Sequence, residues 1–113
     1  MELVQFIAAV KANKPINFND VMAIIEEHYH YAATTFKNGE LTNEQGTNEG
    51  SCKIFAFAHL HDLNQQQTLS LFGDFYQDVL QDPQGEGHQN IRQFMLQGWQ
   101  GIDFGGETVL TLK

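Results

Sequence analysis

Residues Asn43 to Leu63 read NEQGTNEGSCKIFAFAHLHDL, and we expect the rest of the chain to pack around them. The first half is polar and interrupted by glycines, whereas Ile54 to Leu60 are apolar on nearly every side. A short helix without a polar stripe must be covered all round. The pattern therefore predicts a central buried helix from Ser51 to Asp62, entered through a tight loop at Gly46 and Gly50.

The composition indicates one folded, acidic domain. The chain has 113 residues, of which 42% are apolar, so it can form a single core and is not expected to be disordered. Its net charge of −8 repels nucleic acid, and its six Lys and Arg residues are scattered. No apolar run approaches the roughly 18 residues of a membrane span. We therefore expect neither a nucleic-acid nor a membrane partner.

The cellular location is predicted from the cysteine content and the amino terminus. A single cysteine, Cys52, excludes an intrachain disulfide and fits a reducing compartment. The amino terminus lacks the basic region and the long apolar region of a Sec signal. These features predict a cytoplasmic protein.

Four further helices are predicted from apolar residues at helical spacing. Asn17 is the expected N-cap of the second helix of the chain. Asn64 and Gln67 stand in a capping-box relation and open the helix that follows the central one. Gly73 lies inside that helix, where it suggests close packing on a neighbour. The predicted ranges are Glu2–Ala12, Asn17–Tyr29, Asn64–Leu80 and His88–Gln97.

Two short antiparallel hairpins are predicted from glycine-containing turns. One joins residues 34–36 to residues 40–42, and the other joins residues 102–104 to residues 108–110 across Gly105 and Gly106. Isolated two-stranded pieces are only marginally stable, so the hairpins can pair with each other. The expected fold class is α+β: a compact, mainly helical single domain over residues 1–113, with about five helices and one or two hairpins.

Cys52 is the first candidate for chemistry. At a helix start, unpaired N–H groups and the helix dipole lower the pKa of a thiol, and Lys53 adds positive charge. His88 begins another predicted helix, and Asn90 could orient its ring. Together they form a Cys-His-Asn set for a thiol-dependent hydrolase or transferase. The alternative is a small buried thiol, because free cysteine is among the most buried residue types.

The polar loop before the central helix is the second candidate site. N–H groups at a glycine-rich loop and a helix start can hold an anion, with Lys53 and Arg92 supplying charge. However, GTNEGSCK does not match the nucleotide-binding P-loop, and Glu49 repels phosphate. The alternative is that the polar side chains bond within their own loop and cap the helix. The candidate ligand-binding residues are Asn43, Asn48, Glu49, Ser51, Lys53 and Arg92.

The five histidines do not have the spacing of a metal site. His59 and His61 lie two positions apart on the predicted central helix and point about 200° apart, so they cannot ligate one ion together. HExxH and CxxC patterns are absent. We therefore predict no metal and no cofactor, and we expect His28 and His59 to be hydrogen-bonded inside the core. The alternative is a metal site made from one member of each histidine pair and a third group.

Trp99 stands between Gly98 and Gly101, which would let the indole lie flat against a neighbouring element. Packing in the core is the expected role. An exposed contact with a partner is the alternative.

Three long blocks carry a family resemblance. They read NGELTNEQGTNEGSCKIFAFAHL (Asn38–Leu60), LSLFGDFYQDVLQDPQGEGHQNIRQFM (Leu69–Met95) and GWQGIDF (Gly98–Phe104). These blocks resemble the HopJ family, labelled type III effector proteins, and the likeness covers most of the chain from about Phe18. The resemblance implies no defined activity and no catalytic residues. It implies type III secretion toward a host target as the alternative to a cytoplasmic location.

The function expected from the sequence is ligand or partner binding without catalysis. Complete catalytic patterns and cofactor motifs are missing, whereas a polar loop rich in Asn and Gly is present. The partner would be an unidentified small molecule or protein. Thiol chemistry by Cys52 with His88 remains the alternative.

Overall fold

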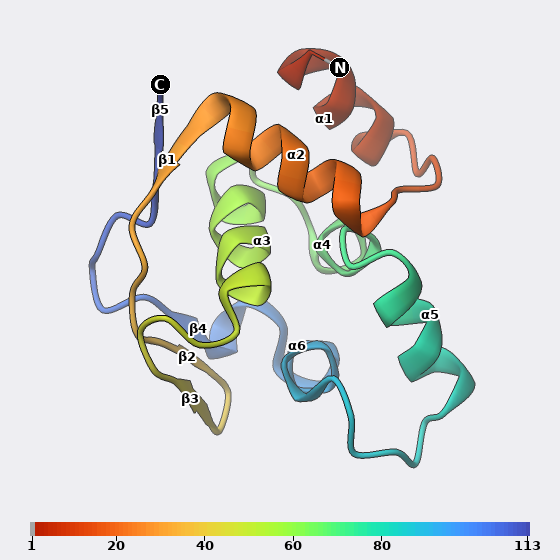
Figure 1. The fold of residues 1–113 in the computed structure, drawn as a ribbon. Helices are drawn as coiled ribbons and strands as arrows, with labels where there is room; N and C mark the ends of the chain where they lie inside the picture. The colour runs from red at the N-terminus through yellow and green to blue at the C-terminus, as the bar shows by residue number, and fades with distance from the viewer. Residues whose placement is uncertain (1) are drawn as a thin grey trace.

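One helix lies at the centre of the molecule. In the computed structural model, which describes residues 2–113, helix α3 (Glu49–Leu60) has other helices around it and small sheets on one side (Figure 1). Six of its residues, Cys52 and the run Ile54–Ala58, are buried. The predicted central buried helix is therefore confirmed. Its ends differ from the expectation, because it begins at Glu49 rather than Ser51 and ends at Leu60 rather than Asp62. Its last turn is exposed at His59 and Leu60.

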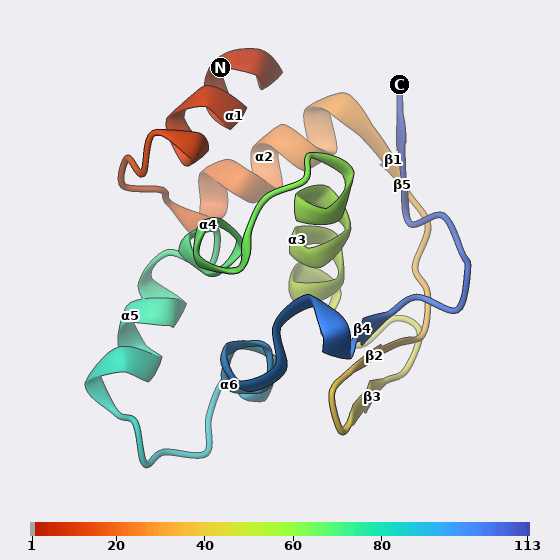
Figure 2. The same cartoon turned by 180° about the vertical axis from the view of Figure 1, so that it is seen from behind.

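Five more α-helices surround α3, which makes six where about five were expected. Helices α1 and α2 cover the carboxyl end of α3, α4 and α5 lie on the side away from the sheets, and α6 lies near its amino end (Figures 1 and 2). Their bounds are α1 Leu3–Lys11, α2 Phe18–His28, α4 Gln65–Ser70, α5 Asp74–Gln81 and α6 Gln89–Gln97. A 3₁₀ turn, η1 (Gly98–Gly101), follows α6.

The predicted helix starts are confirmed at two N-caps. The side chain of Asn17 accepts a hydrogen bond from the N–H of Asn19 at 2.8 Å. Asn64 and Gln67 form a complete capping box, with distances of 2.8 and 3.0 Å. Both devices satisfy N–H groups that a helix leaves without a partner in its first turn.

The helix predicted over Asn64–Leu80 is wrong as a single element, because it breaks at Gly73 into α4 and α5. Gly73 has φ +57°, a conformation that side chains other than glycine rarely adopt. A Cβ atom there would lie 2.9 Å from the backbone nitrogen of Phe18. The close packing expected at Gly73 is thus present, and the break redirects α5 toward the start of α2.

Two small antiparallel sheets lie beside α3. The first hairpin is present, but its arms are residues 36–38 and 41–43 rather than 34–36 and 40–42, with Phe36 paired to Asn43. It occupies one side of a sheet of order β3-β2-β4. The second hairpin is wrong, because its two arms join different sheets: β4 pairs with β2, and β5 pairs with β1. The strand bounds are β1 Tyr29–Tyr31, β2 Phe36–Asn38, β3 Leu41–Asn43, β4 Ile102–Asp103 and β5 Leu110–Leu112.

Phe55 lies at the centre of an aromatic core. Its ring centroid is 4.9 Å from that of Phe94 and 5.6 Å from that of Phe72. Trp99 packs edge-on against Phe94 at 5.2 Å, and its indole nitrogen donates to the carbonyl of Leu63 at 3.1 Å. The chain is therefore the compact single α+β domain expected from its sequence. Within residues 2–113, no helix has both the length and the apolar character needed to cross a membrane.

Candidate functional site

A cleft of about 610 Å³ opens beside the amino-terminal end of α3. This volume lies within the range of roughly 300–1,000 Å³ that is common for small-molecule sites. Residues from four helices, α2, α3, α5 and α6, and from the edge strand β3 line the cleft.

The walls of the cleft are aromatic. Phe18 from the start of α2 meets Phe75 from α5 edge to face, with ring centroids 4.9 Å apart. Phe72 lines the cleft beneath them, and Phe75 is 41% exposed. This arrangement depends on the break at Gly73, because the redirected α5 carries Phe75 toward Phe18.

Two helix starts form the polar rim. Helices α3 and α6 begin after Asn48 and His88, both at positive φ, and neither residue caps its helix through the side chain. Backbone N–H groups in a first helical turn have no intrahelical acceptor. Four residues that line the cleft have N–H groups that make no hydrogen bond within residues 2–113; they are Gly50, Ser51, Gln89 and Asn90.

The cleft lining carries no Lys, Arg, Asp or Glu. His88 is its titratable member, with a ring 5.4 Å from that of Phe75 and with Nε2 3.7 Å from Asp78 Oδ2. A ligand would therefore meet aromatic surface, neutral hydrogen-bonding groups and one imidazole.

Buried asparagine side chains join the hairpin to α6. Asn43 and Asn90 form a reciprocal amide pair, with N–H···O distances of 3.0 and 2.9 Å. The amide of Asn38 donates to the carbonyl and side-chain oxygens of Asn90 at 2.9 and 3.0 Å. Asn48 donates to Asn43 at 2.7 Å, which extends the network to the loop before α3. The network fixes the floor of the cleft where β3, α3 and α6 meet.

The structure brings together five of the nine candidate residues. Those that line the cleft are Asn43, Asn48, Ser51, His88 and Asn90. Cys52, Glu49, Lys53 and Arg92 do not line it.

Both predicted sources of positive charge are engaged elsewhere. The ammonium group of Lys53 lies 4.7 Å from the centre of the Tyr31 ring. The guanidinium of Arg92 donates to the carbonyl of Gly87 at 2.6 Å and braces the loop between α5 and α6. The exposed Glu49 also lies outside the lining, so it does not place a carboxylate in the cleft.

The predicted activation of Cys52 is wrong. The side chain is 1% exposed, and Sγ lies 4.0 Å from the carbonyl of Thr34. Burial raises the pKa of the Cys52 thiol, which outweighs the lowering by hydrogen bonds from Tyr31 and the Thr34 backbone. Asn90 is bonded to other amides, and within residues 2–113 no hydrogen bond joins Cys52 to His88.

We expect Cys52 to resist alkylation in the native protein. Because the thiolate is the reactive form and the group is sealed, iodoacetamide at pH 7 should modify it at least about 100-fold more slowly than in the urea-unfolded chain. Mass spectrometry over time measures both rates. Fast native labelling that His88→Ala slows would instead support the Cys-His-Asn set.

The histidines are distributed over the molecule. The expectation that His28 and His59 are hydrogen-bonded in the core is wrong, because His59 is exposed and Nε2 of His28 makes no hydrogen bond, with Glu27 Oε2 3.8 Å away. His61 instead makes a partly buried hydrogen bond, with Nε2 2.5 Å from the Tyr29 hydroxyl. Within the described residues, no three His, Cys, Asp or Glu side chains gather closely enough to hold an ion.

Sequence reasoning missed the aromatic half of the site. Phe18 and Phe75 each fit the apolar face of an amphipathic helix, which is the usual pattern of a core residue. No local signal distinguishes a residue that packs in the core from one that lines a cleft next to it. Only the path of the chain at Gly73 brings the two rings together.

Comparisons with known proteins agree with this fold. The model of the family described as HopJ type III effector protein matches residues 3–109. The crystal structure of VPA0580, a protein of unknown function, is similar with 47% sequence identity and a TM-score of 0.95, and the match covers 100% of this chain and 95% of that chain. A search of curated proteins finds no match. Since the family model extends over nearly all of the sequence, the chain belongs to the HopJ type III effector family.

Proposed function

We propose that this protein is a binding protein without catalysis of its own. Its cleft takes a small molecule that has an aromatic ring and carries a hydrogen-bond acceptor, such as a carbonyl or carboxylate group. The observation that supports this most directly is the meeting of the Phe18–Phe75 wall with two helix starts in a cleft of about 610 Å³. The Cys-His-Asn alternative has less support, because Cys52 is sealed outside the cleft.

The aromatic wall supplies the surface for the ring of the ligand. Edge-to-face and offset aromatic pairs are worth about 0.5–1.5 kcal/mol beyond the burial of apolar area. Phe75 is partly exposed at the cleft, so a ligand ring would cover surface that water now covers. This burial favours an aromatic ligand over an aliphatic one of the same size.

The rim supplies hydrogen-bond donors for the acceptor group. Four residues of two helix starts line the cleft and carry N–H groups without a hydrogen-bond acceptor within residues 2–113, and one of them, Ser51, also has a hydroxyl group. Fixed N–H groups at helix starts favour an oxygen that carries negative charge. The absence of lysine and arginine from the lining means that a neutral carbonyl is also a suitable acceptor.

Benzoate, benzamide and acetamide are suitable probes of this site. In ¹H–¹⁵N NMR titrations, we expect saturable shifts of the rim amides with benzoate and benzamide. Acetamide has the acceptor but no ring, so it should give no saturation. The preference between benzoate and benzamide then identifies the charge of the acceptor. If neither ring-bearing probe perturbs the rim amides, the proposal fails.

We expect Phe75→Ala to weaken binding of the preferred aromatic probe by about three- to tenfold, because an aromatic contact worth about 1 kcal/mol is lost. Leu80→Ala is the matched control, since Leu80 lies on the same helix, has a similar exposed fraction (47% against 41%) and does not line the cleft. Equal affinities of the two variants would contradict the proposed site.

The proposed binding does not depend on whether the protein is cytoplasmic or exported, because the cleft is built from this chain alone.

A further inference from the structure

A second pocket, of about 340 Å³, lies where η1 leads into β4. It shares no lining residue with the cleft described above. Figure 2 shows the short coil that leads from α6 to β4 in this region. Three rings and two carboxylates line the pocket, from His59, Trp99, Phe104, Asp103 and Glu107.

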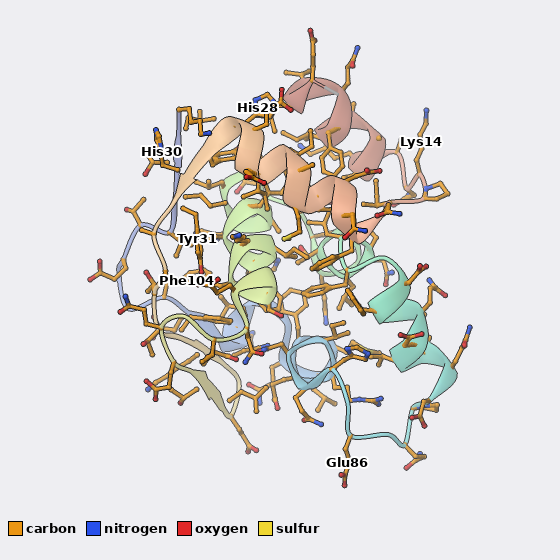
Figure 3. All side chains as sticks on the ribbon, viewed as in Figure 1. Lys14, His28, His30, Tyr31, Glu86 and Phe104 are labelled. Atoms are coloured by element: carbon orange, nitrogen blue, oxygen red, sulfur yellow. The ribbon has the colours of Figure 1, made fainter. Side chains whose placement is uncertain are left out.

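The rings of this pocket are held in place by the core behind them. The indole of Trp99 is fixed by its hydrogen bond to Leu63 and lies 5.8 Å from the ring of the exposed His59. Phe104, labelled in Figure 3, is backed by the buried Phe36 at a centroid distance of 5.7 Å. Trp99 and Phe104 are themselves half-buried, so each presents part of its surface to the pocket.

Neither carboxylate forms an ion pair within the described part of the chain, although Lys37 lies opposite Asp103 in the pairing of β2 with β4. Asp103 uses Oδ1 to accept the N–H of Gly105 at 2.8 Å, which holds the carboxylate at the turn after β4. Glu107 is exposed on the other side of the same turn. Within residues 2–113, no lysine, arginine or histidine forms an ion pair with either group, and no lysine or arginine lines the pocket.

We propose that this pocket binds a quaternary ammonium group. The negative faces of aromatic rings attract cations, and tryptophan does so most strongly. A methylated ammonium group has no strong hydrogen-bond donor, so it fits a pocket that offers rings and nearby negative charge. The net charge of −8 adds long-range attraction for a cation and disfavours anions at this surface.

Choline and its neutral isostere 3,3-dimethyl-1-butanol form a decisive pair of probes. Trp99 is the only tryptophan of the chain, so its fluorescence reports directly on the pocket. We expect choline to cause a saturable change in that fluorescence and the neutral isostere to bind at least about tenfold more weakly, because it matches the shape without the charge. Equal binding of both, or no saturation with choline, overturns the proposal.

A double variant that removes both carboxylates tests whether their negative charge contributes to choline binding. Asp103→Asn combined with Glu107→Gln should weaken choline binding by about tenfold, because both negative charges that line the pocket are removed. Asparagine still offers an oxygen to the N–H of Gly105, so the turn is retained. Glu44→Gln with Glu86→Gln removes the same charge from exposed positions outside the pocket and should change affinity less than twofold. If both double variants bind choline alike, the assignment is wrong.

A third probe distinguishes whether the quaternary ammonium group belongs to a peptide or to a free small molecule. Acetylated and amidated trimethyllysine presents the same ammonium head on a peptide backbone. Tighter binding than choline indicates a methylated peptide, and tighter binding of choline indicates a free small molecule. Failure of either probe to bind at this pocket leaves the proposed aromatic ligand of the larger cleft unaffected, because the two sites share no residue.

Discussion

Gly73→Ala is expected to lower the free energy of unfolding by about 3 kcal/mol or more. Gly73 has φ +57° and ψ −126°, a conformation that is almost confined to glycine and that costs other residues about 1–3 kcal/mol. The added methyl group would also lie 2.9 Å from the backbone nitrogen of Phe18 and 3.1 Å from the carbonyl oxygen of Ile16. Both contacts are with backbone atoms, which cannot rotate away, so overpacking adds about 1–3 kcal/mol.

Gly46→Ala separates the two causes. Gly46 also has a positive φ, +85°, but a Cβ atom there would meet nothing within 4 Å. This variant should therefore lose only the conformational part, about 1–2 kcal/mol. Urea unfolding followed by circular dichroism measures both variants. Equal losses at the two positions would show that the contact between Gly73 and the start of α2 does not carry the effect.

The same glycine controls the cleft. Because α5 is redirected at Gly73, Phe75 meets Phe18 and the aromatic wall forms. A folded Gly73→Ala variant should consequently bind ring-bearing probes more weakly than wild type, even at temperatures where it remains native. The break between α4 and α5 is thus a link between the fold and the proposed function.

Features with a local cause could be predicted from the sequence. The cap at Asn17, the capping box of Asn64 and Gln67, and the burial of Ile54–Ala58 all depend on residues within a few positions of one another. Gly73 shows the limit of this reasoning. The low helix propensity of Gly73 could be recognised from the sequence. The backbone that packs against it lies at Phe18, more than fifty residues away in the chain.

Strand pairing shows the same limit. The turn at Gly105 and Gly106 exists, with both residues at positive φ, yet the strands on either side pair elsewhere. Strand β5 pairs with β1, which joins the carboxyl end of the chain to a segment in its first third. A hairpin signal identifies a change of direction, whereas the choice of partner depends on which strand edges the packed helices leave available.

The candidate site was predictable only on its polar side. Asn43, Asn48 and Ser51 lie in the loop that the sequence singled out, and His88 with Asn90 mark a second helix start. Of the two interpretations of Cys52, the activated thiol is wrong because desolvation outweighs the effects that stabilise the thiolate, and the small buried thiol is confirmed. The sequence allowed both interpretations, and the burial that decides between them depends on the whole fold.

Asn90→Ala is expected to cost about 2–3 kcal/mol of stability. Asn90 lies at the junction of the buried amide network, where it accepts from Asn38 and Asn43 and donates back to Asn43. Its removal leaves the buried amide of Asn43 without an acceptor, and an unsatisfied buried polar group costs about 1–3 kcal/mol. Gln89→Ala is the control, because this exposed neighbour is outside the network and should change stability by no more than about 0.5 kcal/mol.

A double-mutant cycle tests whether the network acts as a unit. If Asn43 and Asn90 stabilise each other, the loss in the Asn43→Ala, Asn90→Ala double variant should be smaller than the sum of the single losses by about 1–2 kcal/mol. Strict additivity would mean that each amide is satisfied independently, and that the distances of 2.9 and 3.0 Å between them carry little energy. Coupling would instead show that the hairpin and α6 hold each other in position. The relative placement of the two helix starts at the cleft then depends on side chains that a ligand need not touch.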